Sequence, residues 1–469
     1  MFKLNTVLMN SPFRGLNHLN EVYFIGIGGI GMSALARFFQ QQGVRVSGYD
    51  KTATPLTREL ETLGIAVHYE ENIQLVPANP DLVIYTPAIP AHHREWLYYQ
   101  ERGQKIVKRS DVLQMISNSS FNICIAGTHG KTTISTMTAH ILRHSGFGCN
   151  AFLGGISGNY NTNFWSHERN VCVIEADEYD RSFLKLSPDI AIISAMDPDH
   201  LDIYGTAENV EQAFIDFAGK VREDGKLIAK YGLKRSNDLK SGKYISYSRE
   251  NKMADVFTDN IRTSEGSYLF DVSLKGHRLQ NVRLNMGGLH NVENITAAIT
   301  AAWLLGIDDE KIKAAVETFK GVKRRFEYVH KDESVVLIDD YAHHPEELKA
   351  LLTGARGLFA ERKMVLFFQP HLYSRTRDFA EAFAEVLELA DEVVLLPIYP
   401  ARELPLEGVE SGMLIDKMKD MKKSVLTKDE MLARVKELLE TGEKILFITA
   451  GAGDIDGLLS PIKKLIENK

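Results

Sequence analysis

The sequence predicts an α/β protein of three domains, in which mostly parallel strands alternate with helices. Its 469 residues are enough for about three domains of ordinary size. Short apolar runs alternate with amphipathic segments along most of the chain, which is typical of open α/β sheets. Glycine-rich and polar loops follow several of these runs, as ligand-binding loops do in such sheets. We place the domains at residues 1–115, 116–320 and 321–469.

Composition excludes several classes of protein. The chain is 44% hydrophobic and 25% charged, as ordinary globular proteins are. Its net charge of −7 argues against nucleic-acid binding, which normally requires a basic surface. Cys124, Cys149 and Cys172 lie in or near apolar runs without a CxxC pair, so we expect buried thiols in a reducing compartment. No apolar run approaches the ~18 residues that span a bilayer, so we expect a cytoplasmic protein without membrane insertion.

The first domain opens with a glycine-rich turn between a strand and a helix. Gly26, Gly28 and Gly31 match GxGxxG after the apolar run that begins at Val22. Asp50 ends the next strand, about 20 residues on, where a dinucleotide fold has its ribose-binding acid. This pattern indicates a diphosphate bound at a helix N-terminus, which suits a UDP-sugar as well as NAD.

Two further strands are expected in this domain, at Leu82–Thr86 and Lys105–Val107. A loop with two prolines follows Thr86. The polar stretch Ser110–Ser120 is interpreted as a linker or a short helix.

The second domain opens with a nucleotide-binding loop. An apolar strand that begins at Ile123 leads into Gly127-Thr-His-Gly-Lys-Thr-Thr133 and then a helix. Backbone N–H groups at such a turn suit a polyphosphate. Lys131 is expected to bridge the outer phosphates, and the Thr132 hydroxyl to hold magnesium. Ile125 stands where the strict pattern has glycine, so this is a P-loop variant.

Two strands after the P-loop end in acidic loops. Val171–Ile174 leads into Glu175-Ala-Asp-Glu-Tyr-Asp180, and Ile190–Ala195 leads into Met196-Asp-Pro-Asp-His200. Acids and a histidine at the carboxyl ends of parallel strands, beside a P-loop, predict a magnesium site. A solvated acidic loop and an Asx-rich turn are the alternatives. The Gly/Asn-rich segment Gly154–Asn161 is predicted to be a loop near the ligands.

The second domain ends with an alanine-rich helix, expected at Ile295–Leu305. His290 and Asn294 precede it and fall four residues apart on one helical face. Two interpretations of this pair stay open: the two side chains bind a shared ligand, or they cap the helix. The third domain has predicted strands at Val335–Ile338, Met364–Phe368, Glu392–Leu396 and Ile445–Ile448. Polar loops follow its strands, as at an open-sheet ligand site.

Together these motifs resemble the Mur ligase family along nearly the whole chain. They read GIGGIGMSALA (26–36), GTHGKTT (127–133), EADEYDRSF (175–183), DPDHLDIYG (197–205), GLHNVENITAA (288–298), RRF (324–326), DDYAHHP (339–345), QPHLYSRTRD (369–378) and GAGD (451–454). The resemblance implies an N-terminal Rossmann-like domain that binds a UDP-sugar, a central P-loop ATPase domain with a mostly parallel sheet, and a C-terminal Rossmann-like domain that binds an amino acid.

The resemblance also implies an activity: ATP-dependent joining of L-alanine to the lactyl carboxylate of UDP-N-acetylmuramate, through an acyl phosphate, in peptidoglycan precursor synthesis. ATP and Mg²⁺ are the implied cofactors. The matching ATP-binding positions are Gly127, Thr128, His129, Gly130, Lys131, Thr132, Thr133, His290, Asn294 and Arg325. The matching metal positions are Thr132, Glu175 and His200. We expect a monomer or weak homodimer.

The two outer domains supply the remaining predicted positions. Those for the UDP-sugar are Gly26, Gly28, Gly29, Gly31, Asp50 and Thr86. Those for the amino acid and the acyl group are Tyr341, His343, His371, Arg375 and Arg377. Arg375 or Arg377 would pair with the carboxylate of alanine, and His343 or His371 would act as the base. Some sister ligases use a carbamylated lysine as metal ligand; residues 208–217 contain no lysine, so a carboxylate or water should serve.

Three other hypotheses stay open at this point. A recycling ligase would attach a tripeptide to the same UDP-sugar, although a pair of arginines near the chemistry suits a small free amino acid better. An NAD-dependent oxidoreductase would use the loop that starts at Gly26, but it leaves the P-loop unexplained. A regulatory ATP-binding module would not need both Glu175 and His200.

Overall fold

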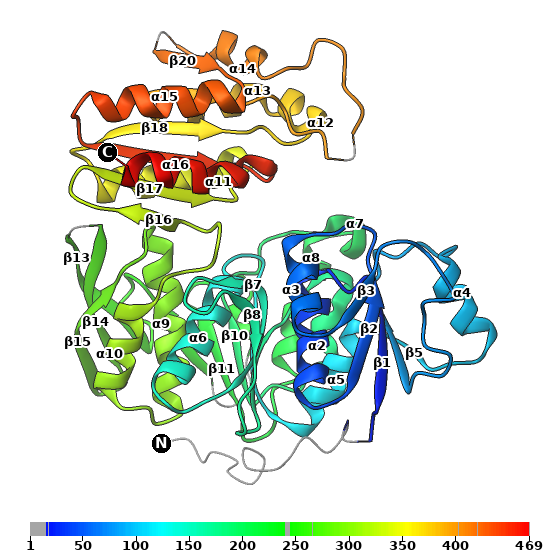
Figure 1. Cartoon of the computed structure of the whole chain (residues 1–469). Helices are drawn as coiled ribbons and strands as arrows, with labels where there is room; N and C mark the ends of the chain where they lie inside the picture. Colours follow the sequence, from blue (N-terminus) through cyan, green and yellow to red (C-terminus); the bar gives the residue numbers. More distant parts are fainter. Residues whose placement is uncertain are drawn as a thin grey trace. The chain divides into compact units, whose positions relative to one another are not determined.

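The computed structural model describes residues 16, 18–239, 244–264, 266–401, 403–419 and 421–468 (Figure 1). Most of the extension that precedes the first strand lies outside the described residues. The chain forms two compact units. The first comprises Met1–Asp259, Phe270–Val282 and Glu293–Thr318, and the second Asn260–Leu269, Arg283–Val292 and Phe319–Lys469. The predicted boundaries near 115 and 320 therefore stay predictions.

The N-terminal sheet has five parallel strands in the order β3-β2-β1-β4-β5. The strands are β1 (Glu21–Ile25), β2 (Arg45–Tyr49), β3 (Ala66–His68), β4 (Leu82–Tyr85) and β5 (Ile106–Lys108), with helices α2 (Ile30–Gln41), α3 (Pro55–Thr62), α4 (Arg94–Glu101) and α5 (Arg109–Ser119). The strand order reverses between β1 and β4, and ligands bind at such a switch point. The loops after these two strands begin at Gly26 and Thr86, so the predicted Rossmann-like domain is confirmed.

The central sheet has ten strands in the order β15-β14-β13-β12-β11-β10-β6-β9-β7-β8. They are β6 (Phe121–Ala126), β7 (Asn150–Ser157), β8 (Thr162–Trp165), β9 (Val171–Glu175), β10 (Ile190–Ile193), β11 (Lys226–Lys230), β12 (Tyr244–Ser248), β13 (Val256–Ser264), β14 (Ser267–Leu274) and β15 (His277–Leu284). Strand β6 pairs in parallel with β10 on one side and β9 on the other. The P-loop strand therefore lies between the two strands that carry the acidic loops, which places both loops beside the P-loop, as predicted.

The helices that follow the central strands are α6 (Lys131–His144), α7 (Leu201–Tyr204), α8 (Ala207–Ala218), α9 (Leu289–Leu304) and α10 (Asp309–Thr318), with 3-10 helices η1 (Tyr179–Lys185) and η2 (Ser236–Leu239). Two local predictions were wrong. Helix α9 begins at Leu289, so His290 and Asn294 lie inside it. The predicted loop Gly154–Asn161 begins within strand β7, which forms an antiparallel pair with β8.

The C-terminal sheet has six strands in the order β16-β17-β21-β18-β19-β20. They are β16 (Glu327–Lys331), β17 (Val335–Asp340), β18 (Lys363–Phe368), β19 (Glu392–Leu395), β20 (Lys422–Val425) and β21 (Ile445–Ala450). The helices are α11 (Pro345–Leu358), α12 (Tyr373–Asp378), α13 (Ala380–Leu387), α14 (Gly412–Lys417), α15 (Lys428–Glu440), η3 (Asp454–Leu458) and α16 (Leu459–Glu467). Only β16 is antiparallel to its neighbour.

One continuous core joins the first two sheets. Phe38 of α2 packs against Phe152 and Phe164 of the β7–β8 hairpin, with ring centroids 5.6 and 6.1 Å away. All three rings are nearly inaccessible to solvent, and burying side chains of this size stabilises a core by about 2 kcal/mol each. This apolar contact explains why the two predicted N-terminal domains form a single compact unit.

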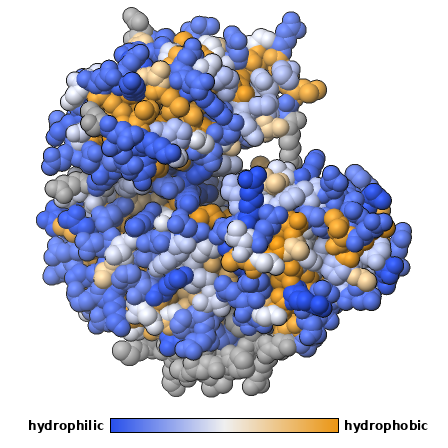
Figure 2. All heavy atoms as spheres, viewed as in Figure 1, coloured by the Kyte–Doolittle hydropathy of each residue, from blue (hydrophilic) through white to orange (hydrophobic). Residues whose placement is uncertain are grey.

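The three cysteines and the hydrophilic surface match what the composition predicts for a globular protein. Cys124, Cys149 and Cys172 are free and buried, as predicted, and burial raises the pKa of Cys149 and of Cys172 to about 12. Hydrophilic side chains cover much of the face shown in Figure 2, with apolar patches between them. Among the described residues, no helix combines the length and the apolar character that crossing a bilayer requires.

Candidate active site

The P-loop has the backbone that a phosphate-binding turn needs. Strand β6 is buried throughout, and the chain turns at Gly127 (φ 136°) and Gly130 (φ 83°) before α6 begins at Lys131. A Cβ on Gly127 would lie 2.2 Å from Ser194 Oγ, so this position requires glycine both for its φ and for space. The turn directs the N-terminus of a 14-residue helix at one point, as predicted.

Lys131, the predicted phosphate ligand, forms a buried ion pair. Its Nζ donates to the carbonyl oxygen of Gly127 at 2.9 Å and to Glu178 Oε1 at 2.7 Å. The side chain of Glu178 is 1% exposed and that of Lys131 is 16% exposed. A short contact with little solvent is strong electrostatically, because the local dielectric constant is low. The sequence placed Glu178 in an acidic loop but did not select it as a site residue.

Thr132 and Glu175, both predicted metal ligands, are in direct contact. The Thr132 hydroxyl donates to Glu175 Oε1 at 2.9 Å. The other carboxylate oxygen accepts from the backbone N–H of Gly154 at 2.9 Å and from Ser135 Oγ at 3.4 Å. Burial raises the pKa of Glu175, because desolvation disfavours the charged form. A bound cation would oppose that cost.

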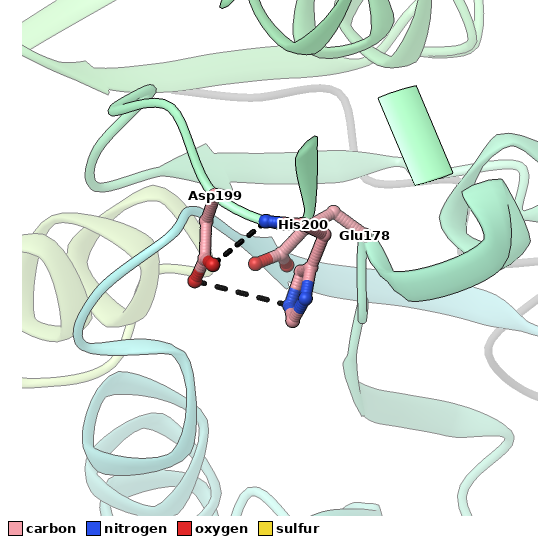
Figure 3. Close-up of side chains that lie close together, drawn as sticks. All are labelled: Glu178, Asp199 and His200. Atoms are coloured by element: carbon pink, nitrogen blue, oxygen red, sulfur yellow. Dashed lines mark hydrogen bonds and ion pairs between the residues drawn. The ribbon is translucent and has the colours of Figure 1, made fainter. Parts of the chain in front are cut away.

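His200, the third predicted metal ligand, lies in a group with Glu178 and Asp199 (Figure 3). One ligand atom from each of the three lies within 4.8 Å of the others. The backbone N–H of His200 donates to Asp199 Oδ1 at 2.7 Å, and its Nε2 is 3.8 Å from Asp199 Oδ2. Two carboxylates and an imidazole form a donor set that fits a divalent cation. Glu178 Oε2 is moreover buried without a hydrogen-bond partner.

The sequence predicted that a carboxylate or a water molecule replaces the carbamylated lysine that some sister ligases use as a metal ligand. Helix α8 contains no lysine, as the sequence indicated. Glu178 and Asp199 supply carboxylates beside His200 instead. A carboxylate in that role stays a prediction.

A cavity of about 270 Å³ connects the glycine-rich loop with the acidic loop. Its walls include Gly29, Gly31 and Thr86 from the N-terminal sheet, and Gly154, Glu175 and Asp177 from the central sheet. The structure thus brings three predicted UDP-sugar residues together with a predicted metal ligand. A carboxylate-bearing substrate bound by the first group would lie beside the second.

The glycine-rich loop is shaped by Asp50. The carboxylate of Asp50 accepts from the N–H of Gly28 at 2.8 Å and from the N–H of Thr52 at 3.2 Å. A Cβ on Gly26 would lie 2.6 Å from Thr86 Cγ2, so the loops after β1 and β4 are in close contact. Asp50 therefore orders the loop itself, and its contact with a ribose stays a prediction.

Arg109 is a residue of the cavity wall that the sequence did not indicate. A Cβ on Gly31 would lie 2.7 Å from Arg109 Nη1, and Nη2 lies 3.9 Å from Asp177 Oδ2. The guanidinium therefore lies over the start of α2, where a diphosphate would bind. Arg109 opens α5 directly before the stretch Ser110–Ser120, which was interpreted as a linker or short helix, and no local motif marks it.

The remaining predicted nucleotide residues are divided between the two units. A Cβ on Gly130 would lie 2.9 Å from Asn294 Oδ1, so Asn294 lies against the P-loop. His290 is in the first turn of α9 and belongs, with Arg325, to the second unit. Their approach to a nucleotide stays a prediction.

The second unit brings most of the predicted amino-acid residues into one cluster. The ring of His343 lies 5.2 Å from that of Tyr341 and 5.9 Å from that of His371, centroid to centroid. Arg375 Nη1 is 3.5 Å from His371 Nδ1. Burial lowers the pKa of His371, and the neighbouring His343 and Arg375 lower it further. His371 is therefore neutral near pH 7, as a base must be.

Arg377 differs from its predicted partners. It pairs with the adjacent Asp378, Nε to Oδ1, at 2.8 Å, and both side chains are more than half exposed. An exposed pair of this kind contributes little stability. Of the two arginines, Arg375 is the one that the structure joins to the histidine cluster.

Comparison with protein families finds three models that together match most of the chain. The Mur ligase family, catalytic domain, matches residues 21–120. The Mur ligase middle domain matches 125–302, and the Mur ligase, glutamate ligase domain matches 324–453. These three ranges coincide with the three sheets of the structure.

Curated relatives and solved structures agree with these matches. The chain is 46% identical over 455 residues to UDP-N-acetylmuramate–L-alanine ligase of Flavobacterium johnsoniae, covering 96% of this chain and 99% of the relative. It is 47% identical over 466 residues to the same enzyme of Cytophaga hutchinsonii, covering 97% and 98%. Among solved structures, UDP-N-acetylmuramate-alanine ligase of Thermotoga maritima superposes with a TM-score of 0.80 at 29% identity, over 96% of this chain and 100% of that chain. The chain therefore belongs to the Mur ligase family.

Proposed function

We propose that the protein is an ATP-dependent ligase that joins L-alanine to the lactyl carboxylate of UDP-N-acetylmuramate. The observation that carries this proposal is the shared cavity. It places the glycine-rich loop, suited to a diphosphate, beside Glu175, whose carboxylate contacts the P-loop Thr132. The relatives named for this reaction, at 46 and 47% identity over nearly their full length, support the same substrates.

A carboxylate is a poor acyl donor, so activation comes first. The lactyl carboxylate attacks the γ-phosphorus of ATP and forms an acyl phosphate, releasing ADP. Because both reacting groups are anionic, positive charge and positioning carry the catalysis. Lys131 contacts the β- and γ-phosphates, and Arg325 is assigned as a further cation for the nucleotide. Arg109 and the N-terminus of α2 hold the diphosphate of the sugar nucleotide.

Magnesium is held by Thr132, Glu175 and His200 in this proposal. When bound, it supplies the charge that neutralises phosphate oxygens. The buried carboxylate of Glu175, which accepts from the Thr132 hydroxyl, supports this assignment, because buried anionic groups need a compensating charge.

Amide formation follows, and residues of the second unit bind the amino acid. Arg375 binds the carboxylate of L-alanine and directs its amine toward the acyl carbon. The amine loses its proton to His371 or His343 and attacks, and the tetrahedral intermediate expels phosphate. The reaction would take place in the cytoplasm and contribute to peptidoglycan precursors.

The test is phosphate release from ATP by the purified protein. Release is expected only when UDP-N-acetylmuramate and L-alanine are both present. Equal release with the murein tripeptide would favour the recycling ligase instead. Hydride transfer to NAD would overturn the reaction class, and ATP binding without turnover would favour a regulatory module.

A further inference from the structure

Glu178 is a buried carboxylate with only one of its two oxygens paired. Its side chain is 1% exposed. Oε1 accepts from Lys131 at 2.7 Å, and Oε2 has no hydrogen-bond partner. Buried polar atoms are almost always satisfied, so an unpaired carboxylate oxygen calls for a ligand or another physical explanation.

Two hydrogen bonds to its backbone carbonyl oxygen fix the position of Glu178. Its carbonyl oxygen accepts from the Tyr204 hydroxyl at 2.6 Å and from the N–H of Arg181 at 2.9 Å. Tyr204 is buried and is the last residue of α7, the short helix that begins directly after Asp199 and His200. The carboxylate thus has two sets of neighbours. The ammonium of Lys131 donates to Oε1, and the side chains of Asp199 and His200 lie close to it as well (Figure 3).

Both neighbours of Glu178 are groups that the proposed function engages. A polyphosphate would compete with Glu178 for Lys131, since both are anions and Lys131 is one cation. A carboxylate left buried without its cation is costly. A divalent cation at Asp199 and His200 would remove that cost and would use the unpaired oxygen.

We propose that Glu178 exchanges partners during catalysis: it neutralises Lys131 before ATP binds, and afterwards it becomes a ligand of the metal ion beside Asp199 and His200. This inference rests on the proposed use of ATP. Its consequence is positive coupling, in which nucleotide raises metal affinity and metal raises nucleotide affinity by the same factor. Glu178 would also compete with metal-free ATP for Lys131.

Two substitutions separate these roles. In Glu178→Gln, the side-chain amide is uncharged, so it cannot form an ion pair with Lys131 and binds a metal ion only weakly. The variant should therefore bind metal-free ATP more tightly than the wild type and lose most of the nucleotide-dependent gain in metal affinity. In Lys131→Met, the carboxylate has no cation to hold. This variant should bind metal more tightly than the wild type when no nucleotide is present.

The measurements are direct binding titrations of the full chain. Mn²⁺ binding is followed by electron paramagnetic resonance, with and without a non-hydrolysable ATP analogue. ATP binding in EDTA is followed by calorimetry. In the wild type, the analogue should raise Mn²⁺ affinity about 5- to 150-fold, the usual range of coupling between sites. Asp180→Asn is the matched control, because it removes a carboxylate from the same loop outside the cluster, and it should behave as the wild type does.

The outcomes distinguish the exchange from the proposed function. Unchanged Mn²⁺ binding in both Glu178→Gln and Lys131→Met would overturn the exchange. So would weaker binding of metal-free ATP by a folded Glu178→Gln. If the wild type bound no ATP at all, the proposed function itself would fail.

Discussion

The Thr132 hydroxyl donates a hydrogen bond to Glu175 Oε1 at 2.9 Å. This contact joins the first turn of helix α6 to the end of strand β9. The contact follows from sheet register, because Glu175 pairs with Ile125 in the parallel ladder between β9 and β6. Two residues 43 positions apart thus meet at the carboxyl ends of adjacent strands. That is where open α/β sheets bind ligands.

Replacing Lys131 should separate ATP chemistry from sugar binding. Lys131→Ala removes the cation of the P-loop, and we expect phosphate release to fall by at least about 10²-fold, as when other preorganised charge stabilisers are lost. Binding of UDP-N-acetylmuramate, measured by calorimetry, should change little, because its loop lies on the N-terminal sheet. A melting curve checks the fold, since Glu178 loses its partner. Loss of both functions in a folded variant would mean that the domains have been assigned wrongly.

Gly127 should tolerate no side chain. Gly127→Ala adds a Cβ 2.2 Å from Ser194 Oγ at a φ of +136°. Overpacking and backbone strain together should lower the free energy of unfolding by about 3 kcal/mol and disrupt nucleotide binding. Gly146→Ala is the control, because Gly146 also has positive φ (+77°) but open space around its Cβ position. Denaturant unfolding should show the larger loss for Gly127→Ala. Equal losses would mean that backbone strain alone sets the requirement.

Arg109 should contribute to sugar-nucleotide binding. Its guanidinium lies over Gly31 in the cavity, and charge-assisted hydrogen bonds to phosphate are worth about 1.5–3 kcal/mol. Arg109→Ala should therefore raise the KM for UDP-N-acetylmuramate at least about tenfold, with the KM for ATP little changed. Arg102→Ala is the control, because Arg102 follows helix α4 of the same sheet's domain, stacks on Tyr98 and is not part of the cavity wall. A similar rise in KM in both variants would contradict the assignment.

The rate should depend on a histidine whose pKa lies below the ordinary value. Burial lowers the pKa of His371 from 6.5, so its neutral, basic form persists to lower pH than in an exposed histidine. Activity is lost as pH falls through this pKa, and the acid limb of the kcat/KM profile, which reports the free enzyme, should therefore inflect below pH 6.5. His371→Gln should abolish that limb and lower kcat by about 10²–10⁴-fold.

His343→Gln is the comparison for this experiment. If His371 is the base, this variant keeps the acid limb. If the limb survives in His371→Gln and disappears in His343→Gln, the base is His343.

Much of the fold was predictable because its signals are local. Apolar runs such as Ile190–Ile193 are recognisable as buried strands, and the glycines at 26, 28 and 31 mark a turn before a helix. Strands β16 and β20 escaped prediction because they lie at the edges of their sheet and are only partly buried. An edge strand needs no continuous apolar run.

The sequence by itself determined the α/β class, the P-loop turn and the two acidic loops that follow later strands, since each depends on a contiguous pattern. Tertiary structure decided what no contiguous pattern encodes. Arg109 reaches Gly31 only because the start of α5 lies close to the start of α2, and Glu178 pairs with Lys131 only because β9 lies next to β6. Such pairs form through space between segments far apart in the chain. Their partners therefore depend on sheet order and packing, which a motif does not contain.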